Sequence, residues 1–146
     1  MISVIQRVKE SFVEVNKKQI IKIKKGLLVF VAIESTDNLE TIKKFTKKIL
    51  KLRIFNDDNG NMNLSIQEIK GELMIIPQFT LTADTKKGNR PGFSGCCHPS
   101  IAQPIFNDLF EYTKNEYSKT YSGFFGTDMN IGIVNEGPAT FMMRIQ

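Results

Sequence analysis

Residues 72–82 read Glu-Leu-Met-Ile-Ile-Pro-Gln-Phe-Thr-Leu-Thr and give the strongest indication of the fold. The apolar run at 73–76 is unbroken, which is typical of a strand buried on both faces. Pro77 has no N–H to donate, so regular pairing is expected to falter there. Gln78 and Thr80 follow with an amide and a hydroxyl. The segment predicts an interior strand whose end forms a site, with a plain strand-to-loop junction as the alternative.

Several other segments have the apolar alternation or the short apolar runs of strands. Residues 1–8 and 11–15 lie close enough in the chain to form a hairpin. Gly26 precedes a strongly apolar segment, which predicts a second buried strand. The predicted strands are residues 1–8, 11–15, 19–24, 27–33, 52–55, 73–76, 129–133 and 141–145.

Two segments carry apolar residues at helical spacing. The first begins after Asp37, which is the expected N-cap. The second runs from about Ser100 to Tyr117, with Pro104 in its first turn, where proline costs least. With the strands, these segments predict an α/β fold of mixed β-sheets packed in layers with two main helices. We expect a single compact domain over residues 1–146.

The outer face of the first predicted helix is rich in lysine. Such a face is typical of a solvated surface, and a direct role in nucleic-acid binding is the alternative. Over the whole chain, 20 Lys and Arg stand against 15 Asp and Glu, a net charge of +5. This balance favours a polyanionic partner without establishing one. The lysines of this face are Lys43, Lys44, Lys47, Lys48 and Lys51.

The cysteines and the apolar runs indicate a compartment. Cys96 and Cys97 are adjacent, which is poor geometry for a mutual disulfide and indicates a reducing environment. The longest apolar run, residues 27–33, is far shorter than the ~20 residues that span a bilayer. Residues 1–8 alternate like a strand and lack the layout of a signal peptide. We therefore expect a cytoplasmic protein with no membrane partner.

The chain offers little acid–base or metal chemistry. His98 is its one histidine, so no further Cys or His is left to complete a zinc shell around Cys96-Cys97-His98. The acidic loop at 56–61 lacks ligands at the first and last positions of a calcium loop. Neither a P-loop nor a GxGxxG motif is present. We expect no metal and no cofactor, and an enzyme of this sequence would depend on backbone donors and positioning.

Two irregular segments remain. Residues 83–99 are long and lack periodicity, which is typical of a functional or a disordered connection. Lys86, Lys87 and Arg90 lie in it among glycines, a composition that suits nucleic-acid contact, with a mobile surface loop as the alternative. The second segment, Asn-Glu-Gly-Pro-Ala-Thr at 135–140, is a tight turn in the simplest interpretation. Composition alone leaves the isomer of its Gly-Pro bond open.

Gln78-Phe79-Thr80-Leu81 after a buried strand, together with residues 135–140, resembles the D-aminoacyl-tRNA deacylase family. The resemblance implies a homodimer that hydrolyses the ester joining a D-amino acid to the 3′-terminal adenosine of tRNA. Its partners would be aminoacyl-tRNA and a second copy of the chain. Shorter matches extend the resemblance over essentially the whole chain; they are residues 5–8, 26–29, 53–55, 62–64 and 83–91.

The resemblance also implies roles for single residues. Gln78, Phe79 and Thr80 would form the catalytic site, with the Phe79 N–H stabilising the oxyanion and the other two shaping the pocket. Thr80 as a nucleophile is the less favoured alternative, because no base adjoins it in sequence. Gly137 and Pro138 would enter the partner's pocket through a cis bond. Their carbonyl oxygens would bind the α-amino group and exclude an L side chain, a filter that also admits glycine.

Other residues are implied around this centre. Arg7 would brace the Gly-Pro loop, Met129 would pack by the adenosine, and Lys86, Lys87 and Arg90 would contact tRNA phosphates. Pro77 departs from the family, which usually has serine there, and resembles a paralogue that clears mischarged alanine from tRNA. Two alternatives therefore stay open: an editing deacylase for a mischarged L-aminoacyl-tRNA, and a non-catalytic tRNA-binding module of the same fold.

Overall fold

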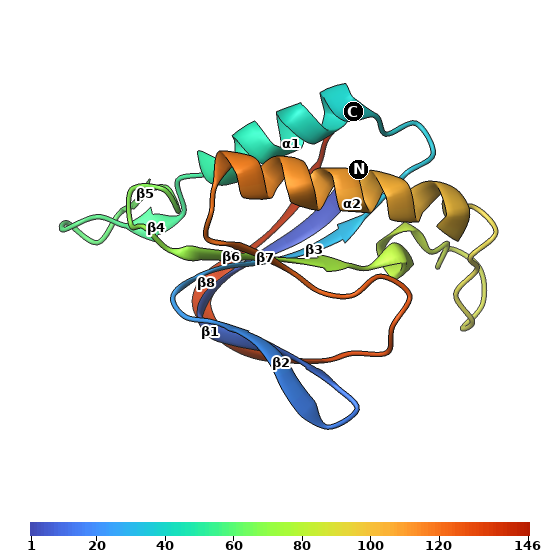
Figure 1. Cartoon of the computed structure of the whole chain (residues 1–146), viewed down its shortest axis with the longest axis horizontal. Coiled ribbons are helices and arrows are strands. Elements are labelled where there is room, and N and C mark those ends of the chain that lie inside the picture. Colours follow the sequence, from blue (N-terminus) through green and yellow to red (C-terminus); the bar gives the residue numbers. More distant parts are fainter.

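The main sheet is built on one long strand, β1 (Ile2–Val15) (Figure 1). The computed structural model describes residues 1–146, with the side chain of Gln19 left aside. The other strands of this sheet are β2 (Lys18–Ile23), β3 (Gly26–Ala32), β6 (Glu72–Pro77), β7 (Thr120–Ser122) and β8 (Asn130–Arg144). Their order is β2-β1-β3-β6-β7, and β8 also pairs with β1. A separate two-stranded sheet consists of β4 (Phe55–Asn56) and β5 (Met62–Leu64).

Strand β6 lies inside the sheet, as the apolar run at 73–76 predicts. It pairs in parallel with β3 on one side and with β7 on the other. The side chains of Leu73, Met74 and Ile75 are fully buried. Gly26 is required at the start of β3, because a Cβ there would stand 1.8 Å from the Glu72 carbonyl oxygen. The close approach of the two strands therefore fixes their register.

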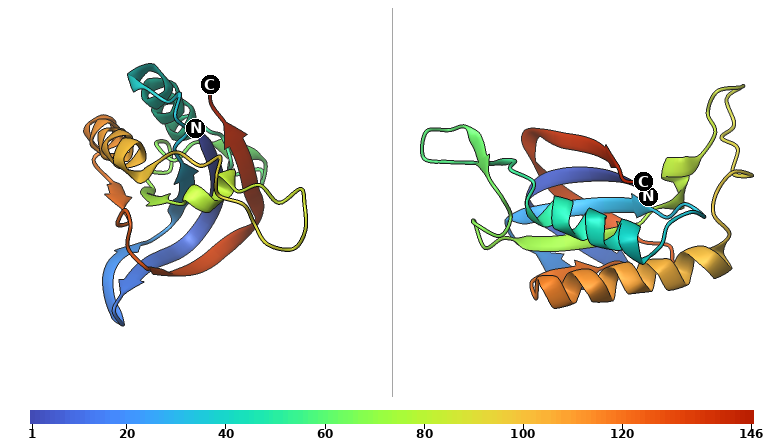
Figure 2. Two further views of the ribbon diagram at one scale, coloured as in Figure 1. Left: turned by 90° about the vertical axis from the view of Figure 1, so that its right-hand side faces the viewer. Right: turned by 90° about the horizontal axis from the view of Figure 1, so that it is seen from above.

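Both helices, α1 (Leu39–Leu50) and α2 (Pro99–Glu116), cover the same face of the sheet (Figure 2). Their apolar stripes pack with the inner residues of β1, β3 and β6 into the larger core cluster. A buried hydrogen bond between the Thr46 and Thr113 hydroxyls, 2.8 Å long, joins the two helices. A smaller cluster that includes Val8, Leu28 and Met74 forms a second core. The α/β architecture of mixed sheets and two helices in one compact domain is therefore confirmed.

The two helix starts differ from the prediction. Asn38, not Asp37, is the N-cap of α1, and its side chain accepts from the Glu40 and Thr41 N–H groups. Asp37 instead accepts from the N-terminal ammonium of Met1 at 2.7 Å, a contact between residues far apart in sequence. Helix α2 begins at Pro99, so Pro104 lies inside the helix beyond its first turn.

The strand boundaries differ as well. Residues 1–8 and 11–15 form one strand, β1, instead of a hairpin. Residues 129–133 and 141–145 likewise belong largely to one strand, β8, which runs through the predicted break. The predicted strand at 52–55 is reduced to β4, and β5 and β7 are strands that the sequence pattern does not predict. Among the described residues, no helix is long and apolar enough to cross a membrane.

Candidate active site

Strand β6 ends at a cavity of about 470 Å³. The Gln78 N–H donates to the Val31 carbonyl at 2.8 Å, so pairing continues one residue beyond Pro77. The chain then turns into a short 3₁₀ helix, η1 (Phe79–Thr82). Pro77, Gln78 and Phe79 line the cavity. Its volume lies in the range of small-molecule sites.

Aromatic rings form much of the cavity wall. Phe79 and Phe93 stand with ring centroids 5.5 Å apart, and Phe106 and Phe125 with centroids 6.0 Å apart. All four line the cavity. Such a wall can receive a flat ring by stacking or edge contact. Sequence reasoning did not place Phe106 or Phe125 at the site, because a phenylalanine on an apolar helix face or after a glycine looks like core.

The backbone at the start of η1 offers unpaired donors. The first N–H groups of a helix have no partner within it, and the Phe79 and Thr80 N–H groups make no hydrogen bond in the described part of the chain. The Phe79 carbonyl, in contrast, accepts from the Thr82 hydroxyl at 2.7 Å. Two adjacent free N–H groups beside an apolar cavity are suited to binding a developing negative charge.

Gln78 and Thr80 are neighbours in space. The Gln78 side-chain amide donates to the Thr80 hydroxyl at 2.5 Å. Thr80 is exposed and does not line the cavity. Among the described residues no histidine, carboxylate or amine is hydrogen-bonded to its hydroxyl, so nothing there activates it as a nucleophile.

Cys96, Cys97 and His98 also line this cavity. Burial, with a smaller contribution from the Asp37 carboxylate, raises the pKa of the Cys97 thiol, which stays protonated at neutral pH. The Cys96 sulfur accepts from the Thr82 hydroxyl at 3.0 Å. His98 is the N-cap of α2 and accepts the Ser100 N–H through Nδ1. The described residues contain no cluster of three or more His, Cys, Asp or Glu that could hold a metal.

The Gly-Pro motif forms a bulge in β8. Gln6 pairs with Thr140 and Val8 with Asn135, so residues 136–139 stand opposite the single residue Arg7. The Gly137–Pro138 peptide bond is cis, as the resemblance implies. Gly137 and Pro138 are both exposed. The bulge therefore presents its backbone to whatever faces this part of the strand.

Arg7 is almost fully buried and braces this bulge. Its guanidinium donates to the Glu136 carbonyl at 3.1 Å and to the Gly137 carbonyl at 3.2 Å. Its remaining nitrogen donates to the Ile54 carbonyl at 2.5 Å and to the Asn56 side chain at 3.0 Å. The predicted contact between Arg7 and the Gly-Pro loop is present. The same side chain ties the bulge to the chain just before β4.

The bulge and the cavity lie at opposite ends of the central strands. Arg7 is level with Leu27, and Leu27 with Leu73. Gln78 is five residues beyond Leu73, which corresponds to about 16 Å along the strand. Neither Gly137 nor Pro138 lines the cavity. One chain therefore does not bring the Gly-Pro carbonyls to Gln78.

The remaining predicted residues flank the cavity. Met129 does not line it, and its sulfur accepts from the Phe124 N–H at 3.2 Å. Lys86, Lys87 and Arg90 are exposed on a loop whose base is closed by two hydrogen bonds of 2.8 Å between Asp84 and Gly92. Phe93 follows this loop directly and lines the cavity, so the loop is attached at the cavity wall.

Comparison with known proteins gives one consistent result. A model of the family described as D-Tyr-tRNA(Tyr) deacylase matches residues 4–144. A D-aminoacyl-tRNA deacylase of Francisella tularensis subsp. novicida is 45% identical over 145 residues, covering 99% of this chain and 100% of that protein. The D-aminoacyl-tRNA deacylase of Dichelobacter nodosus is 43% identical with the same coverage.

Two solved structures share the fold. The c-Myc DNA Unwinding Element Binding Protein superposes with a TM-score of 0.93 at 31% identity, covering 99% of this chain and 98% of that one. A probable eukaryotic D-amino acid tRNA deacylase superposes with a TM-score of 0.82 at 17% identity, with 97% of each chain covered. The second likeness concerns the fold alone. Because the family model and the relatives extend over nearly the whole sequence, the chain belongs to the D-Tyr-tRNA(Tyr) deacylase family.

Proposed function

We propose that the protein hydrolyses the ester bond between a D-amino acid and the 3′-terminal adenosine of tRNA, in the cytoplasm where translation occurs. Family membership makes it a hydrolase of carboxylic esters. The observation that carries the proposal is the free N–H of Phe79, a residue that lines the aromatic cavity, with the free N–H of Thr80 next to it in the chain. The rings hold the adenosine, and the ester carbonyl lies against the free N–H groups.

The chemistry needs little from the side chains. Water adds to the ester carbonyl, and the negative charge on the carbonyl oxygen is stabilised by the Phe79 N–H. The carbon–oxygen bond to the ribose then breaks, the 3′-oxygen takes a proton, and free tRNA and a D-amino acid are released. The neighbouring 2′-hydroxyl of the ribose assists the proton transfer. Gln78 and Thr80 position the ester, and Pro77, which lines the cavity, borders the adenosine.

Selection for D-amino acids comes from a second copy of the chain. In a homodimer, the bulge of one subunit enters the cavity of the other, and the Gly137 and Pro138 carbonyl oxygens bind the α-amino group and exclude an L side chain. The separation of about 16 Å between bulge and cavity within one chain supports this arrangement. So do the apolar side chains that β8 leaves exposed, which are Ile133, Val134, Phe141 and Met142.

The basic loop holds the tRNA near the cavity. Lys86, Lys87 and Arg90 are exposed, and within the described part of the chain none of them is paired with a carboxylate. They contact phosphates. Replacing all three with alanine should weaken tRNA binding. The negative slope of log affinity against log salt concentration should become shallower by about 3. An unchanged slope would make the loop a plain surface feature.

The test of the function is deacylation of D-tyrosyl-, L-tyrosyl- and glycyl-tRNA side by side. We expect the D-tyrosyl and glycyl esters to be cleaved, because glycine has only a hydrogen where the filter rejects an L side chain. Survival of D-tyrosyl-tRNA would contradict the deacylase. If glycyl-tRNA survives while D-tyrosyl-tRNA is cleaved, the site binds the D side chain directly and the rejection filter is wrong.

Pro77 supports one second candidate, an editing deacylase for a mischarged L-aminoacyl-tRNA. It occupies the position where the family usually has serine, and it lines the cavity. L-alanyl-tRNA is therefore the fourth substrate of the same assay. Faster cleavage of L-alanyl- than of D-tyrosyl-tRNA would favour this candidate, and binding of tRNA without cleavage of any ester would indicate a non-catalytic module.

A further inference from the structure

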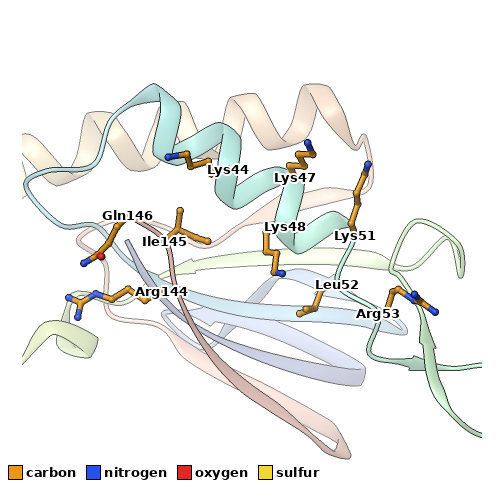
Figure 3. A pocket seen from close by; sticks show the side chains of 9 residues that line it. All are labelled: Lys44, Lys47, Lys48, Lys51, Leu52, Arg53, Arg144, Ile145 and Gln146. Atoms are coloured by element: carbon orange, nitrogen blue, oxygen red, sulfur yellow. The ribbon is translucent and has the colours of Figure 1, made fainter.

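A groove of about 740 Å³ runs along α1 (Figure 3), and none of its lining residues lines the cavity of the candidate active site. Helix α1 forms one wall, and the chain after it and the C-terminal end of β8 form the rest. Six of the nine lining residues are cationic, and Leu52 and Ile145 are the apolar ones. We call this the α1 groove. Its cationic residues are Lys44, Lys47, Lys48, Lys51, Arg53 and Arg144.

Most of this positive charge is not neutralised within the chain. Lys44 pairs with Glu40 at 3.1 Å, and Arg144 pairs with Glu34. Among the described ion pairs, none involves the other four cations of the groove. Four cations without an ion-paired carboxylate therefore line one hollow, in a chain whose net charge is +5. A concentration of one sign attracts a polyanion.

The α1 groove is connected with the cavity of the candidate active site. A hollow of about 440 Å³ lies between them. It shares Cys97 with the cavity and Arg144 with the α1 groove. The 12 residues of α1 extend the path by about 18 Å. The three hollows are therefore neighbours on the surface. The middle one contains the paired charges of Glu34 and Arg144, and the unpaired cations belong to the α1 groove.

We infer that the α1 groove binds the sugar–phosphate backbone of the tRNA whose 3′ end occupies the cavity. This inference rests on the proposed function, which supplies the tRNA. Lysine ammonium groups bind phosphates as point charges, and their contribution is independent of base sequence. The apolar floor of Leu52 and Ile145 suits the carbon faces of the ribose. A solvated lysine face alone would account for the charge, but not for a groove that neighbours the hollow beside the cavity.

The test compares two variants with the same loss of charge. The groove variant is Lys47→Gln/Lys48→Gln/Lys51→Gln, in which glutamine keeps a similar helix propensity. The control variant is Lys18→Gln/Lys24→Gln/Lys25→Gln, on exposed residues of β2 and of the connection from β2 to β3. None of the three lines the α1 groove. Binding of uncharged tRNA is measured over a range of salt concentrations, so that ester hydrolysis plays no part.

We expect the groove variant to bind tRNA about tenfold more weakly, and the negative slope of its log affinity against log salt concentration to become shallower by about 3. The affinity of the control variant should stay within about twofold of the wild type. Equal losses in both variants would mean that only overall charge matters, and would overturn the inference. An unchanged affinity in the groove variant would also overturn it. Binding of poly-L-glutamate, an acidic polypeptide, is measured in parallel. If the groove variant loses affinity for poly-L-glutamate but not for tRNA, the inference is also overturned, because the α1 groove would then be a docking site for an acidic protein.

A minimal substrate separates this inference from the proposed function. The D-tyrosyl ester of adenosine reaches the cavity but not the α1 groove. The groove variant should cleave this ester at the wild-type rate and should show a raised KM only for D-tyrosyl-tRNA. If the wild type cleaves neither substrate, the proposed function is wrong. The salt dependence of tRNA binding still shows whether the α1 groove binds tRNA.

Discussion

At the level of single residues, the candidate site depends on backbone atoms. The Phe79 N–H is free because it is the first donor of η1. The Gly137 carbonyl is held by Arg7, whose guanidinium is itself fixed by the Ile54 carbonyl. In the proposed mechanism, the side chains position the backbone and transfer no proton to or from the substrate. That explains how a chain with one histidine can belong to a family of hydrolases.

A substitution at Phe79 can remove its backbone N–H and still keep the 3₁₀ turn. Proline is tolerated at the first position of a helix and has no N–H. Phe79→Pro should therefore lower kcat for D-tyrosyl-tRNA by about 10²–10³-fold, the usual cost of one oxyanion donor. Phe79→Ala loses the same ring but keeps the N–H, and its kcat should fall far less. Equal losses of kcat in the two variants would assign the effect to the aromatic ring.

His98 lines the cavity, yet its contacts are those of a helix cap. His98→Ala should cost about 1 kcal/mol in the free energy of unfolding, because the Ser100 N–H loses its acceptor. His98→Asn should restore most of this, since asparagine is a favourable N-cap. Both variants should keep the turnover of D-tyrosyl-tRNA. A folded His98→Asn protein without turnover would give the imidazole a chemical role.

At the level of elements, the sequence predicted what depends on local pattern. The buried strand at 73–76 is correct because an unbroken apolar run needs cover on both faces. The cap of α1 was placed one residue early, because Asp37 and Asn38 are both good caps and the choice depends on a distant group. The N-terminal ammonium forms an ion pair with the Asp37 carboxylate, which is therefore not free to cap the helix. Nothing in the local sequence reports that contact.

The site was predicted unevenly for the same reason. Gln78, Phe79 and Arg7 stand in recognisable motifs, whereas Phe106 and Phe125 reach the cavity only through tertiary packing. Strand β8 is predicted as two segments, because the bulge at 136–139 looks like a chain reversal in sequence. It remains part of a strand since β1 pairs with β8 on both sides of it.

The N-terminal end of β1 is held by a small charge cluster that makes stability depend on pH. Glu34 contacts the Met1 ammonium at 2.8 Å and also pairs with Arg144. Burial by itself would raise the pKa of Glu34, but the hydrogen bonds from Arg144 and the ammonium outweigh it, and the pKa lies below its ordinary value of 4.5. The resulting stabilisation is complete above pH 4.5 and is lost as the pH falls through the lowered pKa.

Glu34→Gln should therefore lower the free energy of unfolding by about 1 kcal/mol at neutral pH, as for a partly exposed ion pair. The difference from the wild type should shrink below pH 4.5 and vanish once Glu34 is protonated in the folded protein. Urea unfolding of both proteins between pH 3 and pH 7 measures this. A difference that stayed constant over this range would mean that packing, and not charge, is responsible.

At the level of the whole molecule, the cavity and the bulge lie at opposite ends of the same strands. In the proposed homodimer, two copies related by a two-fold axis would place each bulge at the partner's cavity in a reciprocal contact. The exposed apolar residues of β8 lie on both sides of the bulge, with Met142 81% exposed. Burying them would supply the hydrophobic contact that an obligate dimer needs.

A mixing experiment tests this arrangement. A Cβ on Gly137 would meet its nearest atom within the chain at 3.7 Å, an ordinary contact. Gly137→Ala should therefore fold normally, and any loss of activity reports what the bulge meets in the assembly. We expect Gly137→Ala and Phe79→Pro each to be nearly inactive on D-tyrosyl-tRNA. Circular dichroism and the unfolding transition of each variant serve as the folding controls.

After subunit exchange between these two variants, half of the dimers are mixed. In each mixed dimer, one site combines the intact cavity of the Gly137→Ala subunit with the intact bulge of the Phe79→Pro subunit. About a quarter of the wild-type activity should therefore return. If the bulge acted on the cavity of its own chain, every site would contain one damaged part and mixing would restore nothing. An active monomer at low concentration would contradict the shared site in the same way.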